Sequence, residues 1–250
     1  MEFECTPEGF AGRVKQLREA NDPDKFFTFF DGGWAGTKQG AFDKAESIFE
    51  GMMMPWAHKT PSTLGGTSLD IGYGGGGQVR AASYYFETAI GIDVHGEWEY
   101  VINSLDPPVT DNVITLLQGD GHTLKEIGDN EIDFVHSWTT FMHLRNMGVV
   151  QSYLKEIHRV LSPGGTAIIY FSRLRRSGRA WADWAKDIQL EKAFAKRKGK
   201  AEVNQITLMI GLKCFEDKAM QAGLWPLGRT ASHGVAGLGG QHGVALIKEE

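Results

Sequence analysis

The chain has 250 residues, of which 42% are hydrophobic and 23% are charged. This composition is that of a globular protein, and it excludes a disordered or coiled-coil chain. The net charge of −5 disfavours general binding of nucleic acid. Two cysteines are too few for a disulfide framework. Residues 1–10 are acidic and no apolar run reaches 18 residues, so we expect no signal peptide, no membrane span and a cytoplasmic location. One count is unusual, the 32 glycines, and their positions matter below.

The first 66 residues are predicted to form an N-terminal helical extension or cap. Apolar residues recur there at helical spacing, and the clearest series is Phe42, Ala45, Ile48, Phe49 and Met52. A stripe of this kind favours core packing over a cofactor site.

From residue 67 the pattern changes to short strands that alternate with helices. The predicted strands are 67–72, 89–94, 113–118, 132–137 and 166–172, and the predicted helices between them are 76–86, 97–103 and 146–160. Such alternation predicts an α/β fold with a parallel sheet and helices on both faces. The carboxyl ends of the strands then meet at one edge, where ligands bind.

The C-terminal part departs from this pattern. A helix at 215–223 is followed by strands at 225–232 and 241–248, and their short connection leaves no room for a helical crossover. We therefore expect an antiparallel hairpin at the end of the sheet. Pro163 and Gly164, before the fifth strand, are the typical central pair of a type II turn.

The strongest signal is a glycine loop after the first predicted strand. Gly72, Gly74 and Gly76 stand between that strand and a helix, so the backbone can approach a ligand closely. Asp93 ends the next strand, seventeen residues after Gly76, where a carboxylate can accept both hydroxyls of a ribose.

Two cofactors are compatible with the glycines alone. Gly72, Gly74 and Gly77 satisfy the dinucleotide fingerprint, which leaves a nicotinamide-dependent oxidoreductase open. Asp70 favours a cationic ligand, because an acid beside a pyrophosphate is unfavourable. Asp120 closes the third strand and adds a second acid at the same edge, in reach of an adenine amine.

With these motifs in this order, the chain resembles a class I S-adenosylmethionine-dependent methyltransferase of the small-molecule type. The resemblance spans about residues 67–247, and the matching pieces are 69–76, 91–93, 119–120, 133–144 and 159–165. It implies a Rossmann-like, seven-stranded, mostly parallel sheet whose last strand is antiparallel. It also implies a domain at 67–250 with a helical cap insert at 173–212.

The resemblance further implies where the cofactor binds. The three glycines of the loop would line its methionine part, Asp93 the ribose and Asp120 the adenine, while Asp70 would support the loop and the amino group. The complete predicted cofactor set is Asp70, Gly72, Tyr73, Gly74, Gly76, Asp93, Gly119, Asp120, Gly121 and Ser137.

Candidates for the acceptor side follow the fourth strand. His143 occupies the place where many relatives carry a histidine, and an imidazole with an ordinary pKa of about 6.5 suits proton abstraction from a hydroxyl. A role in packing alone stays open. Trp138 and Phe141 would form an apolar wall or pack in the core, and Arg173 and His233 are further substrate candidates.

The insert carries a strong local charge. Residues 173–200 hold ten basic and three acidic side chains, an excess of +7 that leaves −12 elsewhere. Trp181, Trp184 and Ile188 are spaced as one helix face, so we expect either a cap that attracts an anionic metabolite or a solvated helix. No histidine spacing or acid cluster predicts a metal site.

The sequence thus predicts an enzyme that methylates a small molecule, at oxygen rather than nitrogen. A non-catalytic cofactor-binding or scaffold protein stays open as an alternative. The sequence does not indicate the oligomeric state.

Overall fold

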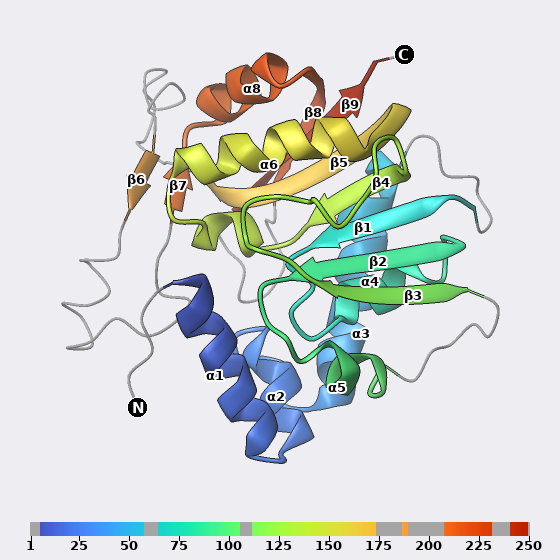
Figure 1. Ribbon diagram of the computed structural model, residues 1–250, viewed down its shortest axis with the longest axis vertical. Coiled ribbons are helices and arrows are strands. Elements are labelled where there is room, and N and C mark those ends of the chain that lie inside the picture. The colour runs from blue at the N-terminus through green and yellow to red at the C-terminus, as the bar shows by residue number, and fades with distance from the viewer. Residues whose placement is uncertain are drawn as a thin grey trace.

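The computed structural model describes residues 6–57, 65–105, 112–173, 187–189, 208–231 and 241–249. Its centre is one sheet with helices on both faces (Figure 1). Five strands run parallel in the order β3-β2-β1-β4-β5. They are β1 (Thr67–Ile71), β2 (Thr88–Asp93), β3 (Val113–Gln118), β4 (Ile132–Ser137) and β5 (Leu161–Arg173). The five predicted strands are therefore confirmed, although β5 begins five residues earlier than predicted.

The predicted C-terminal hairpin is also present. Strand β9 (Gln241–Lys248) lies antiparallel between β5 and β8 (Leu224–Ala231), after helix α8 (Leu212–Gln221). With these two strands the sheet contains the seven predicted strands and is mostly parallel, and two further short strands bring the total to nine in the described part of the chain. Gly164 has φ of +70°, as the second central residue of a type II turn requires.

Two short strands were not predicted. β7 (Leu208–Ile210) pairs with the end of β5, and β6 (Asp187–Gln189) pairs antiparallel with β7. The helical prediction is therefore wrong at Ile188, because hydrogen bonds to β7 hold this segment extended. The rest of the predicted cap helix, with Trp181 and Trp184, lies outside the described residues.

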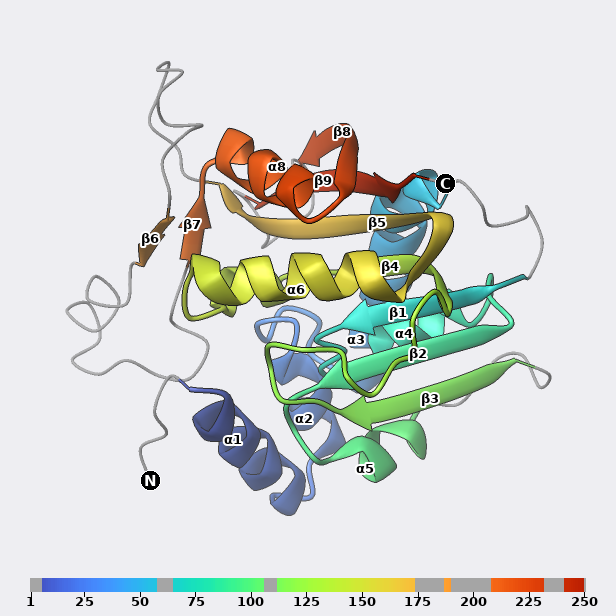
Figure 2. The same cartoon turned by 45° about the horizontal axis from the view of Figure 1, so that its top comes forward.

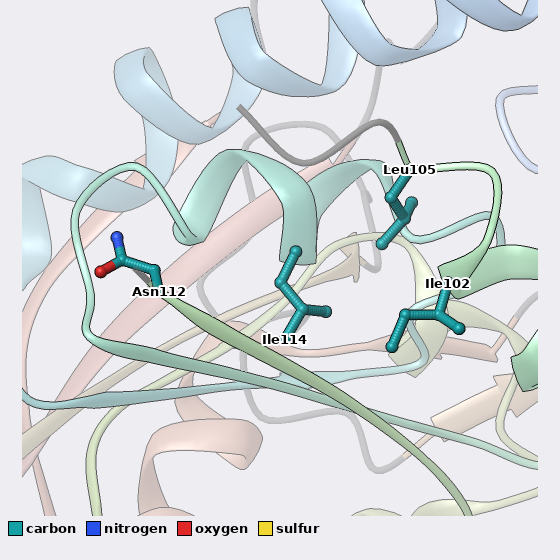
Figure 3. Close-up of a pocket in the computed structure, with 4 residues that line it drawn as sticks. All are labelled: Ile102, Leu105, Asn112 and Ile114. Atoms are coloured by element: carbon teal, nitrogen blue, oxygen red, sulfur yellow. The ribbon is translucent and has the colours of Figure 1, made fainter. Parts of the chain in front are cut away.

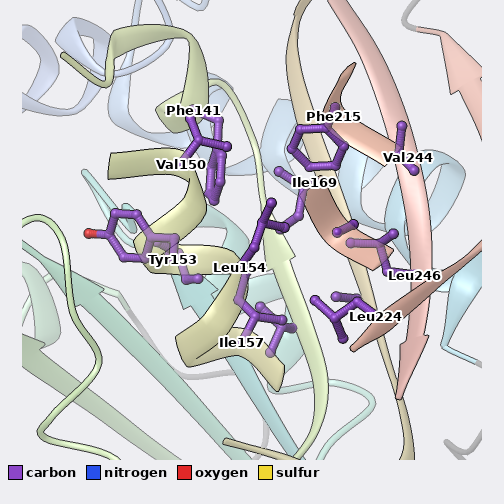
Figure 4. Packing of buried hydrophobic residues seen from close by; sticks show 14 of the residues in the cluster. Phe141, Val150, Tyr153, Leu154, Ile157, Ile169, Phe215, Leu224, Val244 and Leu246 are labelled. Atoms are coloured by element: carbon purple, nitrogen blue, oxygen red, sulfur yellow. The ribbon is translucent and has the colours of Figure 1, made fainter. Parts of the chain in front are cut away.

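The two faces of the sheet carry separate hydrophobic clusters. Helices α6 (Met147–Val160) and α8 cover one face (Figure 2). On that face Val150, Leu154 and Ile157 of α6 are fully buried in one cluster with Ile169 of β5 and Phe215 of α8 (Figure 4). The other face packs on α3 (Lys38–Ile48), α4 (Gly77–Ala82) and α5 (Trp98–Ile102).

The N-terminal segment is helical, as predicted. It contains α1 (Pro7–Glu19), α2 (Pro23–Phe29) and α3, followed by the π-helix η1 (Phe49–Met53) and the 3-10 helix η2 (Met54–Trp56). Thr6, Asp22 and Thr37 cap the three α-helices by accepting a backbone N–H with their side chains. Phe42, Ile48 and Phe49 are buried, so the apolar stripe packs in the core.

A small apolar pocket of about 190 Å³ lies between α5 and the start of β3, lined by Ile102, Leu105, Asn112 and Ile114 (Figure 3). Because β3 runs parallel to β1 and β2, its first residues lie at the edge opposite the glycine loop. Among the described helices, none is long and apolar enough to cross a membrane.

Candidate active site

The glycine loop follows β1 and adopts a backbone that favours glycine at three positions. Gly72, Gly74 and Gly76 have φ of +84°, +54° and +76°. A Cβ atom at Gly74 would stand 2.8 Å from Cδ1 of Phe30, and one at Gly72 would overlap the Thr140 hydroxyl. The loop is therefore held between α2 and the segment after β4, and only glycine fits there.

Asp93 lies at the end of β2, directly beside this loop. It is 8% exposed, and its Oδ2 accepts the N–H of Gly74 at 2.9 Å. Its Oδ1 accepts the N–H of Val94 at 2.7 Å. The N–H of His95 also donates to Oδ1, at 3.4 Å. Since each carboxylate oxygen has two lone pairs, Oδ2 is the oxygen that keeps acceptor capacity for a ligand. The structure thus brings the predicted acid and the predicted loop into direct contact.

The end of β3 contributes the second acid. Burial raises the pKa of Asp120, but hydrogen bonds from the hydroxyl and N–H of Thr123 and the N–H of His122 lower it to about 2. Its carboxylate is thus ionised and shapes its own loop. The neighbouring Gly121 has φ of +82°, and the N–H of Gly119 donates to the carbonyl of Asp93 at 2.8 Å.

Asp70 lies deeper, opposite His136 on the adjacent strand. Both side chains are buried, and Oδ1 of Asp70 is 3.5 Å from Nδ1 of His136. Burial lowers the pKa of His136 to about 3, while burial and then the charge of Asp93 raise the pKa of Asp70. Despite their proximity, the pair is therefore best described as a neutral imidazole beside a carboxyl group that favours its protonated form.

His95 is a site residue that the sequence did not indicate. It is fully buried, its Nδ1 accepts the N–H of Glu97, and its Nε2–H therefore donates to the carbonyl of Gly74 at 2.9 Å. Its ring packs on Tyr73 at 4.9 Å between centroids. In the sequence, His95 is marked only by its position two residues after Asp93. No local pattern indicates its contact with Gly74, because the two residues follow different strands. His95 thus fixes the glycine loop to the loop that follows Asp93.

The buried hydroxyl of Tyr73 has no hydrogen-bond partner among the described residues. Burial, followed by the charges of Asp93 and Glu97, raises its pKa. Ser137 is fully buried, and its hydroxyl donates to the carbonyl of Ile71 at 2.7 Å. Ser137 therefore joins the ends of β4 and β1 through its side chain.

The acceptor-side candidates separate after β4. Trp138 packs on Tyr170 at 4.5 Å between ring centroids, whereas Phe141 is fully buried against Tyr153 on the other face. His143 ends the 3-10 helix η3 (Thr140–His143) and is partly exposed.

The side chains of the two remaining acceptor-side candidates lie outside the described part of the chain. Arg173 is the last residue of β5, and only its backbone is described; His233 lies outside the described residues.

These features fit a nucleoside cofactor with a cationic end. The glycine loop leaves no room for a Cβ, and Asp93, which keeps acceptor capacity, adjoins it. The hydroxyl of Tyr73 and the ring nitrogens of His136 lack hydrogen-bond partners among the described residues. The described part of the chain contains no group of three histidine, cysteine, aspartate or glutamate side chains that could hold a metal ion.

Solved structures with the same fold are numerous. A protein from Pyrococcus horikoshii is 18% identical with a TM-score of 0.59, over 84% of this chain and 92% of the other. A SAM-dependent methyltransferase from Methanosarcina mazei is 16% identical with a TM-score of 0.58, over 78% and 97%. An S-adenosylmethionine-dependent methyltransferase from Mesorhizobium loti is 15% identical with a TM-score of 0.57, over 82% and 99%. At these identities the likeness concerns the fold.

The sequence adds a family match. No curated protein sequence matches the chain, but the model of a methyltransferase domain matches residues 69–169, which run from β1 into β5. This match resolves the two cofactors that the glycines left open. Residues 69–169 belong to a class I methyltransferase domain, and the protein is an enzyme that uses S-adenosylmethionine as its cofactor.

Proposed function

We propose that this enzyme transfers the methyl group of S-adenosylmethionine to a small-molecule acceptor, at oxygen rather than nitrogen, and releases S-adenosylhomocysteine. The observation that carries the proposal is the hydrogen bond that joins Asp93 to Gly74, with Asp120 at the end of the adjacent strand. A glycine loop and two acids at one sheet edge support the proposed binding of the cofactor there.

In this proposal each part of the cofactor has its own partners. The methionine end lies against Gly72, Gly74 and Gly76, and the ribose hydroxyls bind at the carboxylate of Asp93, where Oδ2 keeps acceptor capacity. The adenine amine faces Asp120, whose ionised carboxylate is already shaped by Thr123.

The N-terminal helices act as a cap over this edge. Arg18 of α1 pairs with Glu97 at 3.2 Å, just after β2, and the ring of Phe10 lies 6.5 Å from that of His95. A Cβ at Gly121, after β3, would lie 3.6 Å from Pro7. Helix α1 thus reaches the loops after both β2 and β3, which supports a cap role for residues 1–66.

The bound cofactor supplies a methyl carbon that its sulfonium has already activated. The protein therefore mainly orients the acceptor in line with that carbon and removes its proton. His143 is the proposed base, since it is partly exposed at the end of η3, close in the chain to the end of β4. Trp138 forms part of the wall, and Arg173 and His233 are proposed acceptor contacts. The basic excess of residues 173–200 favours an anionic acceptor.

Mass spectrometry tests the proposal directly. The enzyme is incubated with methyl-labelled cofactor and a cell extract of small molecules, and we expect the label in one acceptor at an oxygen. His143→Ala should lower the maximal rate without changing cofactor affinity. His158→Ala is the matched control, because His158 lies near the end of α6, at the opposite edge. Tight cofactor binding with no labelled acceptor would refute transfer to a small molecule.

A further inference from the structure

His136 is a buried polar group whose presence needs an explanation. It is fully buried on β4, and within the described part of the chain neither ring nitrogen has a hydrogen-bond partner. The rings of Phe49 and Phe134 pack on it at 5.2 and 5.6 Å between centroids. An imidazole without partners is unfavourable in such apolar surroundings.

Among the described residues, the acid that lies against His136 is Asp70. The two residues are direct partners in the parallel register of β1 and β4, so their side chains lie on the same face of the sheet. The carboxyl oxygen and Nδ1 are 3.5 Å apart but do not form a well-directed hydrogen bond. Asp70 stands two residues before Gly72, next to the place proposed for the cationic end of the cofactor.

Other ionisable groups near this pair are engaged elsewhere. On the helices that pack on this face, Glu46 pairs with Arg80 and Glu50 accepts the hydroxyl of Tyr85. The hydroxyl of Tyr170 on β5 donates to the carbonyl of Met52.

On β2, Asp93 accepts backbone N–H groups, and its charge disfavours ionisation of Asp70. In the free protein, burial and this charge raise the pKa of Asp70 and so favour its protonated form, whereas a cationic ligand beside it favours the ionised form.

We propose that His136 is a positioning residue that donates its Nδ1–H to the carboxylate of Asp70 when the cofactor binds, so that binding releases one proton from Asp70 to solvent. This inference rests on the proposed place of the methionine end at the glycine loop. The ammonium and sulfonium favour the ionised carboxylate, because opposite charges at short range stabilise the charged form. The O–H bond of the carboxyl group breaks, the proton leaves to the buffer, and the imidazole stays neutral throughout.

The inference explains why β4 carries histidine here. An ionised carboxylate buried beneath the cofactor needs a donor from the protein. Nδ1 of His136, 3.5 Å from the carboxyl oxygen of Asp70, is close enough to supply one.

Calorimetry in buffers of different ionisation enthalpy tests this, because the dependence of the heat on the buffer counts the protons that are exchanged. For the wild type we expect net release of protons when S-adenosylmethionine binds, measured across a series of pH values. Asp70→Asn should release none. His136→Leu should release fewer protons and bind at least about tenfold more weakly, since a hydrogen bond to a charged group is lost. His136→Gln retains an N–H donor and should recover both properties in part.

Thermal unfolding of each variant separates this role from packing. A purely structural histidine predicts that His136→Leu changes the unfolding temperature but leaves proton release at the wild-type value, and that result would overturn the inference. Wild-type binding without proton release would also overturn it, while leaving the proposed methyl transfer intact. Absence of cofactor binding by the wild type would refute both. If His136→Leu does not fold, the protons released by the wild type, Asp70→Asn and His136→Gln are compared instead. Equal release by the wild type and Asp70→Asn would then overturn the inference.

Discussion

Gly72 provides a test of the glycine loop with a matched control in the same chain. Replacing it by alanine places a Cβ in a left-handed backbone, at φ of +84°, which costs roughly 1–2 kcal/mol. The new atom would overlap the hydroxyl of Thr140 and stand 2.6 Å from its Cγ2. Overpacking of this kind adds about 1–3 kcal/mol.

The predicted total loss is therefore about 2–5 kcal/mol in the free energy of unfolding. For a chain of this size that corresponds to roughly 4–20 °C in Tm, at about 2–4 °C per kcal/mol. Gly33 is the control, because its φ of +79° is almost the same and a Cβ there would meet nothing within 4 Å. Gly33→Ala should lose only the backbone part, about 1–2 kcal/mol.

Thermal unfolding followed by circular dichroism measures both variants, and calorimetry measures cofactor affinity, which only Gly72→Ala should lower. The double variant with Thr140→Ala removes Oγ1 and Cγ2 but leaves Cβ, so it should recover part of the loss. Equal destabilisation by Gly72→Ala and Gly33→Ala, with no recovery in the double variant, would refute the close contact between the loop and Thr140.

Three further predictions follow from single contacts. Asp93→Asn removes the charge that accepts three backbone N–H groups and the proposed ribose hydroxyls, so calorimetry should show affinity for S-adenosylmethionine falling about 10- to 140-fold; unchanged affinity would contradict the ribose assignment. The pKa of Asp120 is lowered to about 2, so its stabilisation is complete above the unfolded value of about 3.9 and is lost as the pH falls through about 2. The stability gap between wild type and Asp120→Asn, measured by thermal unfolding, should therefore shrink between these pH values, and a constant gap would argue against it. Arg159 donates to the carbonyls of Leu124 and Ile127 at 2.8 and 2.9 Å. Arg159→Met should therefore lower the free energy of unfolding, measured in urea, by about 2–3 kcal/mol. A loss below about 0.5 kcal/mol, the range of ordinary surface substitutions, would contradict a stabilising role of these hydrogen bonds.

The sequence by itself determined the features that depend on local chemistry. Alternating strands and helices, and the positive φ of Gly164, follow from propensity and backbone freedom, which act over a few residues. The glycine loop and Asp93 were also predictable as neighbours, because parallel strands bring their carboxyl ends to one edge. Their mutual hydrogen bond confirms that geometry.

Only the tertiary structure decided the contacts between segments distant in the chain. Asp70 and His136 meet because β1 and β4 pair in one register, and a shift by one residue would place them on opposite faces. His95 reaches the carbonyl of Gly74 across two strands. Ile188 is extended because β7 supplies its partner, which overrides the helical spacing that the sequence shows.

The cofactor edge and the pair of His136 and Asp70 differ in the same way, because the first depends on local sequence and the second on contacts between distant segments. The cofactor edge is built from strand ends and short loops, so its residue types and spacing carried the prediction. The pairing of His136 with Asp70 depends on sheet register and on burial beneath Phe49 and Phe134. The register arises when β1 and β4 pair, and the burial beneath Phe49 arises when the N-terminal segment packs on the sheet, so no local pattern encodes either.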